Sequence, residues 1–176
     1  LPTTLGGFLL ADFVIHAFFG VSYAAAIPVF KLSIFNVILN YPATILGYEI
    51  LANNQQKKTV KFVLASSFTN VVLNYFFILQ WGMLGAAVAT LIAQLVNTAG
   101  LYWIAYHIGK FTVWQNLTKI FSATLIMSAF ILIAQFIAIP NYLIFIVAIV
   151  IYFVFLKPFR EAILKEIVDV FKVVRY

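Results

Sequence analysis

The stretch that decides the fold runs from Phe62 to Gly109, FVLASSFTNVVLNYFFILQWGMLGAAVATLIAQLVNTAGLYWIAYHIG, and it contains no Asp, Glu, Lys or Arg. A membrane-spanning helix needs about 20 apolar residues at a rise of about 1.5 Å each, so this run is too long for one crossing. Gln80, Trp81 and Gly82 interrupt it near its middle with a polar, an aromatic and a flexible residue. The sequence therefore predicts a helical hairpin with a tight turn at these three residues.

The composition of the whole chain also indicates a membrane protein. Of its 176 residues, 65% are hydrophobic and 9% are charged, whereas soluble domains carry roughly a quarter charged residues. The mean hydropathy is +1.08. The chain has no cysteine, which excludes disulfides, thiolate metal sites and a cysteine nucleophile, and we expect neither a metal nor a cofactor. It begins at Leu1 without the basic segment and cleavage pattern of a signal peptide, so we expect a fragment that lacks an N-terminal portion.

The other charge-free runs divide in the same way. The run from Ile120 to Leu156 is broken by Pro140 and Asn141, a turn-forming pair between apolar stretches, which predicts a second hairpin. With two more apolar runs near the N-terminus, the predicted spans lie near residues 5–19, 29–52, 60–79, 83–107, 118–138 and 141–156. The predicted fold is an all-α membrane protein, with a bundle of about six transmembrane helices over residues 1–156.

The last part of the chain, residues 157–176, has a different pattern. Apolar residues recur at helical spacing and charged residues lie opposite them, which predicts an amphipathic helix on the inner leaflet. The apolar set is Phe159, Ile163, Ile167, Val170 and Val174, and the charged set is Glu161, Lys165, Asp169 and Lys172. This cytoplasmic tail would serve as a lipid anchor or, alternatively, as a docking helix for a partner.

The positions of the basic residues predict the orientation. Lys57, Lys58 and Lys61 follow the second predicted span, and Lys110 and Lys119 bracket the loop after the fourth. More Lys and Arg residues occur in the tail, whereas the turns between these segments carry no charge. Because basic loops stay on the cytoplasmic side, both ends of the chain are expected in the cytoplasm. The net charge of +6 thus reflects topology, and we expect no nucleic-acid binding.

Polar side chains recur at steps of three and four within the predicted spans, which places them on one face of each helix. Two interpretations remain open: they line a cavity, or they form hydrogen bonds between packed helices. The candidate lining residues are Asn36, Asn40, Thr44, Asn70, Asn74, Thr90, Gln94 and Asn97. Pro42 lies among them and removes one helical hydrogen bond, so a kink is expected there.

Two acidic residues lie within or at the edge of predicted spans. Glu49 is close to the predicted cytoplasmic boundary, where it would reach the headgroups or pair with a loop lysine. Asp12 and His16 are four residues apart and hence neighbours on one helical face. A carboxylate beside an imidazole can bind or relay a proton, so this pair is a candidate ion-coupling or headgroup site. A structural pair and an exit-facing position are the alternatives.

Several motifs resemble a known family. They are Leu46-Gly-Tyr-Glu-Ile-Leu-Ala52, Gln56-Lys-Lys58, Asn70-Val-Val-Leu-Asn74 and Gly82-Met-Leu-Gly-Ala-Ala-Val-Ala-Thr90. In this order they resemble the C-terminal half of the Wzx-type polysaccharide flippases of O-antigen and capsule synthesis, in the superfamily that also contains MATE exporters and the lipid II flippase. The resemblance covers residues 5–156. It departs from the family pattern at Leu79 and Gln80, where the family commonly has Ile-Pro.

The resemblance implies a function for the chain. Such flippases move an undecaprenyl-diphosphate-linked oligosaccharide across the bacterial inner membrane by alternating access between two six-helix halves, and this chain would be one half. Its expected partners are membrane lipid, the lipid-linked oligosaccharide, the missing N-terminal half and polysaccharide polymerases. Gly82, Gly85, Ala86 and Ala89 would allow close helix packing. Lys57, Lys58 and Lys61 would attract the diphosphate, unless they only determine topology.

Three alternatives remain at this level. A drug or metabolite exporter, or a lipid II flippase, would share the fold. A membrane-embedded glycan-processing enzyme would need clustered carboxylates or histidines and a large outer loop, which the sequence does not predict, so we expect no enzymatic activity. A structural subunit would use the polar faces as packing seams.

Overall fold

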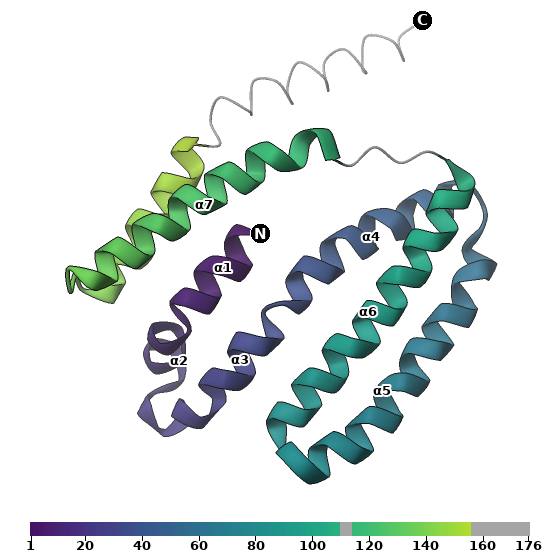
Figure 1. Cartoon of the computed structure of the whole chain (residues 1–176), viewed down its shortest axis with the longest axis horizontal. Coiled ribbons are helices and arrows are strands. Elements are labelled where there is room, and N and C mark those ends of the chain that lie inside the picture. Colours follow the sequence, from purple (N-terminus) through teal and green to yellow (C-terminus); the bar gives the residue numbers. More distant parts are fainter. Residues whose placement is uncertain (110–113, 156–176) are drawn as a thin grey trace, which may run out of the picture.

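The structure, a computed structural model, describes residues 1–109 and 114–155, and every regular element within these ranges is helical (Figure 1). This confirms the all-α prediction. Three described helical segments are long and apolar enough to cross a membrane, namely Val21–Ala52, Gln56–Trp81 and Met83–Ile108. The predicted tail over residues 157–176 and the loop lysine Lys110 lie outside the described residues.

The N-terminal segment is bent. Helices α1 (Pro2–Leu9) and α2 (Ala11–Phe19) meet at an angle of 76°. The first span, predicted near residues 5–19, is therefore interrupted at Leu10, and the pair forms either one broken span or a re-entrant loop. On the first side of the bend, Gly7 lies so close to the Ile34 side chain that a Cβ at this position would overlap it, so α1 packs closely on the start of the second span.

The second span is also interrupted. It consists of the 3₁₀-helix η1 (Val21–Ala26), α3 (Ile27–Ser33) and α4 (Asn36–Ala52), with a break at Ile34 and Phe35. After the break, the amides of Val37 and Ile38 bond to carbonyls three residues back, both at 3.1 Å, which is a tighter turn than an α-helix makes. Pro42 lies inside the continuous helix α4. The interruption thus precedes Pro42 by more than a turn.

The hairpin predicted over residues 62–109 is present. Helix α5 (Thr59–Trp81) follows the short 3₁₀-helix η2 (Gln56–Lys58), and α6 (Met83–Ile108) returns beside it. Gln80 and Trp81 belong to α5, so the connection is Gly82 alone, at φ +56°, a conformation that favours glycine. Figure 1 shows α6 lying between α4 and α5, and its contacts with both helices agree with this.

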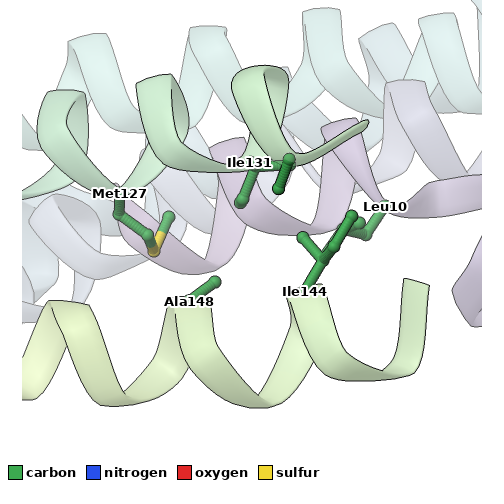
Figure 2. Packing of buried hydrophobic residues seen from close by; sticks show 6 residues of the cluster. Leu10, Met127, Ile131, Ile144 and Ala148 are labelled. Carbon is green, nitrogen blue, oxygen red and sulfur yellow. The ribbon is translucent and has the colours of Figure 1, made fainter. Parts of the chain in front are cut away.

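Two apolar clusters stabilise the arrangement. The first joins α4 to α6 through Ala43, Leu46, Ile50, Leu101, Ile104 and Ala105. The second joins the N-terminal helices to α7 (Trp114–Phe136) and to the following helix, Asn141–Phe155. Figure 2 shows Leu10, Met127, Ile131, Ile144 and Ala148 of this second cluster pointing toward one another. The helix Asn141–Phe155 begins directly after Pro140, where the second turn was predicted.

The outer surfaces of these helices are apolar. Helix α5 has no buried residue, and its large side chains Leu64, Phe68, Val71 and Leu79 are exposed. Such a continuous apolar surface is stable only in contact with lipid or with another apolar surface. The described chain is therefore a multi-pass membrane segment. The part of α7 from Ile120 to Phe136 and the helix Asn141–Phe155 are shorter than the three long segments, so the total of about six spans stays a prediction.

Candidate functional site

The predicted polar rows meet at helix α6. The Gln94 side-chain amide donates a 2.7 Å hydrogen bond to Asn40 Oδ1 and so joins α6 to α4. One turn further along α6, Thr98 Oγ1 donates to the Leu39 carbonyl at 3.4 Å. Both bonds connect residues more than fifty positions apart in the chain, and both hold the same two helices together.

The polar row of α5 faces the other side of α6. Ser66 Oγ donates to the Ala93 carbonyl at 2.7 Å, and Asn74 Nδ2 donates to Asn70 Oδ1 at 2.8 Å. These groups are partly buried. On α6, Asn97 lies one turn beyond Ala93, and its Oδ1 atom is buried with no hydrogen-bond partner within the described residues. An unsatisfied buried oxygen costs about 1 to 3 kcal/mol, so Asn97 is a position where a water molecule or a polar ligand group would be stabilised.

Three of the predicted lining residues have exposed side chains. Asn40, Thr44 and Thr90 are exposed. The hydroxyls of Thr44 and Thr90 donate to carbonyls one turn back in their own helices, both at 2.9 Å. Asn36 is half-buried on the same face of α4. The structure thus brings α4 and α6 together through Asn40 and Gln94, whereas Asn70 and Asn74 bond to each other within α5.

A cavity lies elsewhere in the described structure. It has a volume of about 480 Å³ and lies between the N-terminal helices and the hairpin of α7 and Asn141–Phe155. Its walls are almost entirely apolar, and none of the predicted lining residues belongs to it; they include Leu10, Phe18, Phe30, Ile34, Ile131 and Tyr152. Sequence patterns gave no signal for it, because its walls come from residues 2–34 and 127–153, which are far apart in the chain.

The two acidic residues have partners that the sequence analysis did not name. Asp12 Oδ2 lies 2.9 Å from Lys31 Nζ, with the two side chains 60% and 33% exposed. His16 is exposed, and the hydrogen bond that Asp12 accepts comes from Lys31 rather than from His16. Glu49 accepts a 3.2 Å hydrogen bond from Asn53 Nδ2 rather than pairing with a loop lysine. The ion-coupling role of Asp12 and His16 stays a prediction, to which the structure adds Lys31.

The basic cluster after α4 is exposed. Lys57, Lys58 and Lys61 lie on the surface, and Lys61 Nζ is 4.9 Å from the ring centres of both Phe62 and Trp103. Across residues 1–109 and 114–155, no group of three or more His, Cys, Asp or Glu residues is placed to hold a metal ion.

The small residues of α6 lie where helices touch. Gly85 packs so closely on α5 that a Cβ at this position would overlap the backbone carbonyl of Phe77. Ala89 is fully buried, and Ala86 is half-buried. Gly82, by contrast, has open space around it, and its glycine is required by the positive φ of the turn.

Comparison with known proteins gives one informative match. Over 98 residues the chain is 31% identical to the probable low-salt glycan biosynthesis flippase Agl15 of Haloferax volcanii. The chain is similar to a flippase. The match covers 56% of this chain and 21% of that protein, so the chain spans about one fifth of its relative's length. No family model matches the chain, and no solved structure matches it.

Proposed function

We propose that this chain is part of a flippase that moves a lipid-linked oligosaccharide across a membrane during glycan biosynthesis. The observation that carries the proposal is the match over 98 residues to a probable glycan biosynthesis flippase, within a chain whose long helices can cross a membrane. We further propose a MATE-like architecture in which this chain is the C-terminal half. The remaining helices would come from the other half of the same protein.

The helical arrangement supports a carrier. Discontinuous helices are typical of transporters, and helices of the described structure are interrupted at Leu10 and at Ile34 and Phe35. The glycine and alanine contacts between α5 and α6 permit close packing without large interlocking side chains. A carrier of this kind would rock one helical half against the other around a site at the membrane midplane.

The polar residues suggest where the hydrophilic part of a substrate would pass. Asn40, Thr44 and Thr90 are exposed on helices α4 and α6, and they offer amide and hydroxyl groups of the kind that bind sugars. We propose that this surface faces the other half of the protein and lines the path of the oligosaccharide. The carrier lipid would be undecaprenyl diphosphate, and the membrane would be the bacterial inner membrane. The protein would transport its substrate without making or breaking a covalent bond, so it would not be an enzyme.

The proposal is tested by removing the gene and following the lipid-linked oligosaccharide. Accumulation of this intermediate in the inner leaflet, with export restored by the wild-type gene, is the expected result. A membrane-embedded glycan-processing enzyme would instead leave an unprocessed glycan that still reaches the outer leaflet. An unchanged distribution between the leaflets would contradict the proposed function.

A further inference from the structure

Helices α4 and α6 finish, and α5 begins, at one end of the molecule (Figure 1). An aromatic and basic cluster lies at this end and consists of Lys61, Phe62, Trp103 and His107. Lys61 belongs to the first turn of α5, and Trp103 and His107 belong to the last turns of α6. The positive-inside rule predicts that this end faces the cytoplasm. Trp and Lys at such a level lie at the headgroups of the inner leaflet.

The aromatic part of this cluster is held in place. The Phe62 ring lies so close to Gly100 that a Cβ there would overlap the ring. Phe62 and Trp103 have ring centres 6.0 Å apart, and Trp103 and His107 have ring centres 4.5 Å apart. His107 Nδ1 lies 2.7 Å from the Trp103 carbonyl, and since a carbonyl oxygen only accepts, Nδ1 carries the proton in this contact. The imidazole is thereby fixed beside the Trp103 ring.

The charge on Lys61 lacks a partner of opposite sign in the described part of the chain. Within residues 1–109 and 114–155, the recorded ion pair joins Lys31 to Asp12, and Glu49 is bonded to Asn53. Lys61, Lys57 and Lys58 lie at the start of α5, where the helix dipole disfavours cations, and the first turn of α5 contains no acidic residue. Helix stability therefore does not account for these lysines.

From this geometry we infer that Lys61, held against the rings of Phe62 and Trp103, forms a binding site for the phosphate headgroup of an anionic phospholipid of the surrounding leaflet. The rings of Phe62 and Trp103 position the Lys61 ammonium by cation–π contact. The N–H groups of Lys61 that point away from these rings are left to donate to phosphate oxygens. The acyl chains would lie along the exposed apolar surface of α5, next to Leu64 and Phe68. Lys57 and Lys58 add electrostatic attraction for the anionic headgroup, but no contact within the described ranges fixes the position of their ammonium groups.

The test uses the intact protein, purified in detergent and titrated with phosphatidylglycerol or phosphatidylcholine of identical acyl chains, with bound lipid counted by native mass spectrometry. Trp103→Leu leaves the net charge unchanged, so a merely electrostatic surface would not respond to it. We expect this variant and Lys61→Gln to weaken phosphatidylglycerol binding roughly fivefold each. Tyr102→Leu, which removes an exposed aromatic residue beside Trp103, is the matched control and should bind like the wild type.

Two conservative variants keep the test valid if another variant folds poorly. Lys61→Arg retains the charge and Trp103→Phe retains an aromatic ring, so both should retain the preference for phosphatidylglycerol. Equal affinity for the two phospholipids, or equal effects of Trp103→Leu and Tyr102→Leu, would overturn the proposal. So would displacement of phosphatidylglycerol by inorganic phosphate alone, or a preference of the same residues for polyprenyl diphosphate. The measurement reports lipid binding, so its outcome is independent of whether the protein is a flippase.

Discussion

Lys31 Nζ on α3 lies 2.9 Å from Asp12 Oδ2 on α2, so an ion pair joins these two helices across Gly20 and η1, within a largely apolar segment. At the centre of a bilayer an isolated charge would cost about 2.5 to 3.5 kcal/mol on the lenient insertion scale, and pairing the two charges would reduce the cost of inserting this segment. Lys31 also lies 5.9 Å from the centre of the Phe8 ring on α1. The contact therefore links all three helices around the bend at Leu10.

The ion pair should show energetic coupling. Asp12→Asn and Lys31→Gln each leave one charge without its partner, whereas the double variant removes both charges. We expect a coupling of about 0.5 to 3 kcal/mol between the two positions, measured by a double-mutant cycle on thermal unfolding in detergent. The exchanged pair Asp12→Lys with Lys31→Asp should recover part of the lost stability. Additive effects of the two single substitutions would show that the contact does not stabilise the protein.

His16 provides a separate test of ion coupling. If Asp12 and His16 act together, His16→Ala should reduce transport of the lipid-linked oligosaccharide and leave thermal stability unchanged, because His16 is exposed and has no hydrogen bond to Asp12 within the described residues. Transport is measured by the appearance of the oligosaccharide in the outer leaflet. Normal transport in both His16→Ala and Asp12→Asn would remove these residues from the mechanism.

Gly85 and Gly47 should respond in opposite ways to the same change. Gly85→Ala places a Cβ against the Phe77 carbonyl, so α5 and α6 must move apart and the protein should be destabilised. Gly47 has open space around it within α4, so Gly47→Ala should be neutral or stabilising by about 0.5 to 1 kcal/mol, because alanine loses less entropy in a helix. Melting temperatures of the two variants in one detergent provide the comparison. A tolerated Gly85→Ala would contradict the close packing of this hairpin.

Substitutions at the hydrogen bond between Asn40 and Gln94 distinguish a role in helix packing from a role in substrate binding. A hydrogen bond between membrane helices contributes about 0.6 kcal/mol on average, so Gln94→Leu should have only a small effect on thermal stability. Thr44→Val on the exposed face should have no measurable effect on stability. If these residues line the substrate path, both variants should still reduce oligosaccharide transport. If the transport activity of each variant changes only in proportion to its thermal stability, the polar rows serve helix packing.

The apolar cluster around α7 should be sensitive to truncation. Ile131 is fully buried against Leu10 and Ile144, and Ile131→Ala should cost about 2 to 5 kcal/mol of unfolding free energy through the cavity that it leaves. Its neighbour Leu132 is 55% exposed, and Leu132→Ala should cost much less. Equal losses for the two variants, measured by thermal unfolding, would indicate that α7 is rotated relative to this arrangement.

Much of the secondary structure could be predicted from the residues alone. The charge-free run from Phe62 to Gly109, with its glycine near the middle, predicts the α5–α6 hairpin, because helix length is limited by the thickness of the bilayer. Pro140 likewise predicts the start of the last described helix, since proline is tolerated at a helix start and in turns but not in a helix interior. Both signals are local, and local chain geometry is sufficient to interpret them.

The sequence by itself determined that the chain is helical, that it inserts into a membrane and where its hairpins turn, because these properties depend on residues close together in the chain. Only the tertiary structure decided that Asp12 pairs with Lys31, that the first span bends at Leu10 and that Lys61 lies against Trp103. Those contacts join different helices, whereas helical periodicity describes the residues of one helix at a time. They depend on how whole helices pack, which the spacing of residues along one helix does not specify.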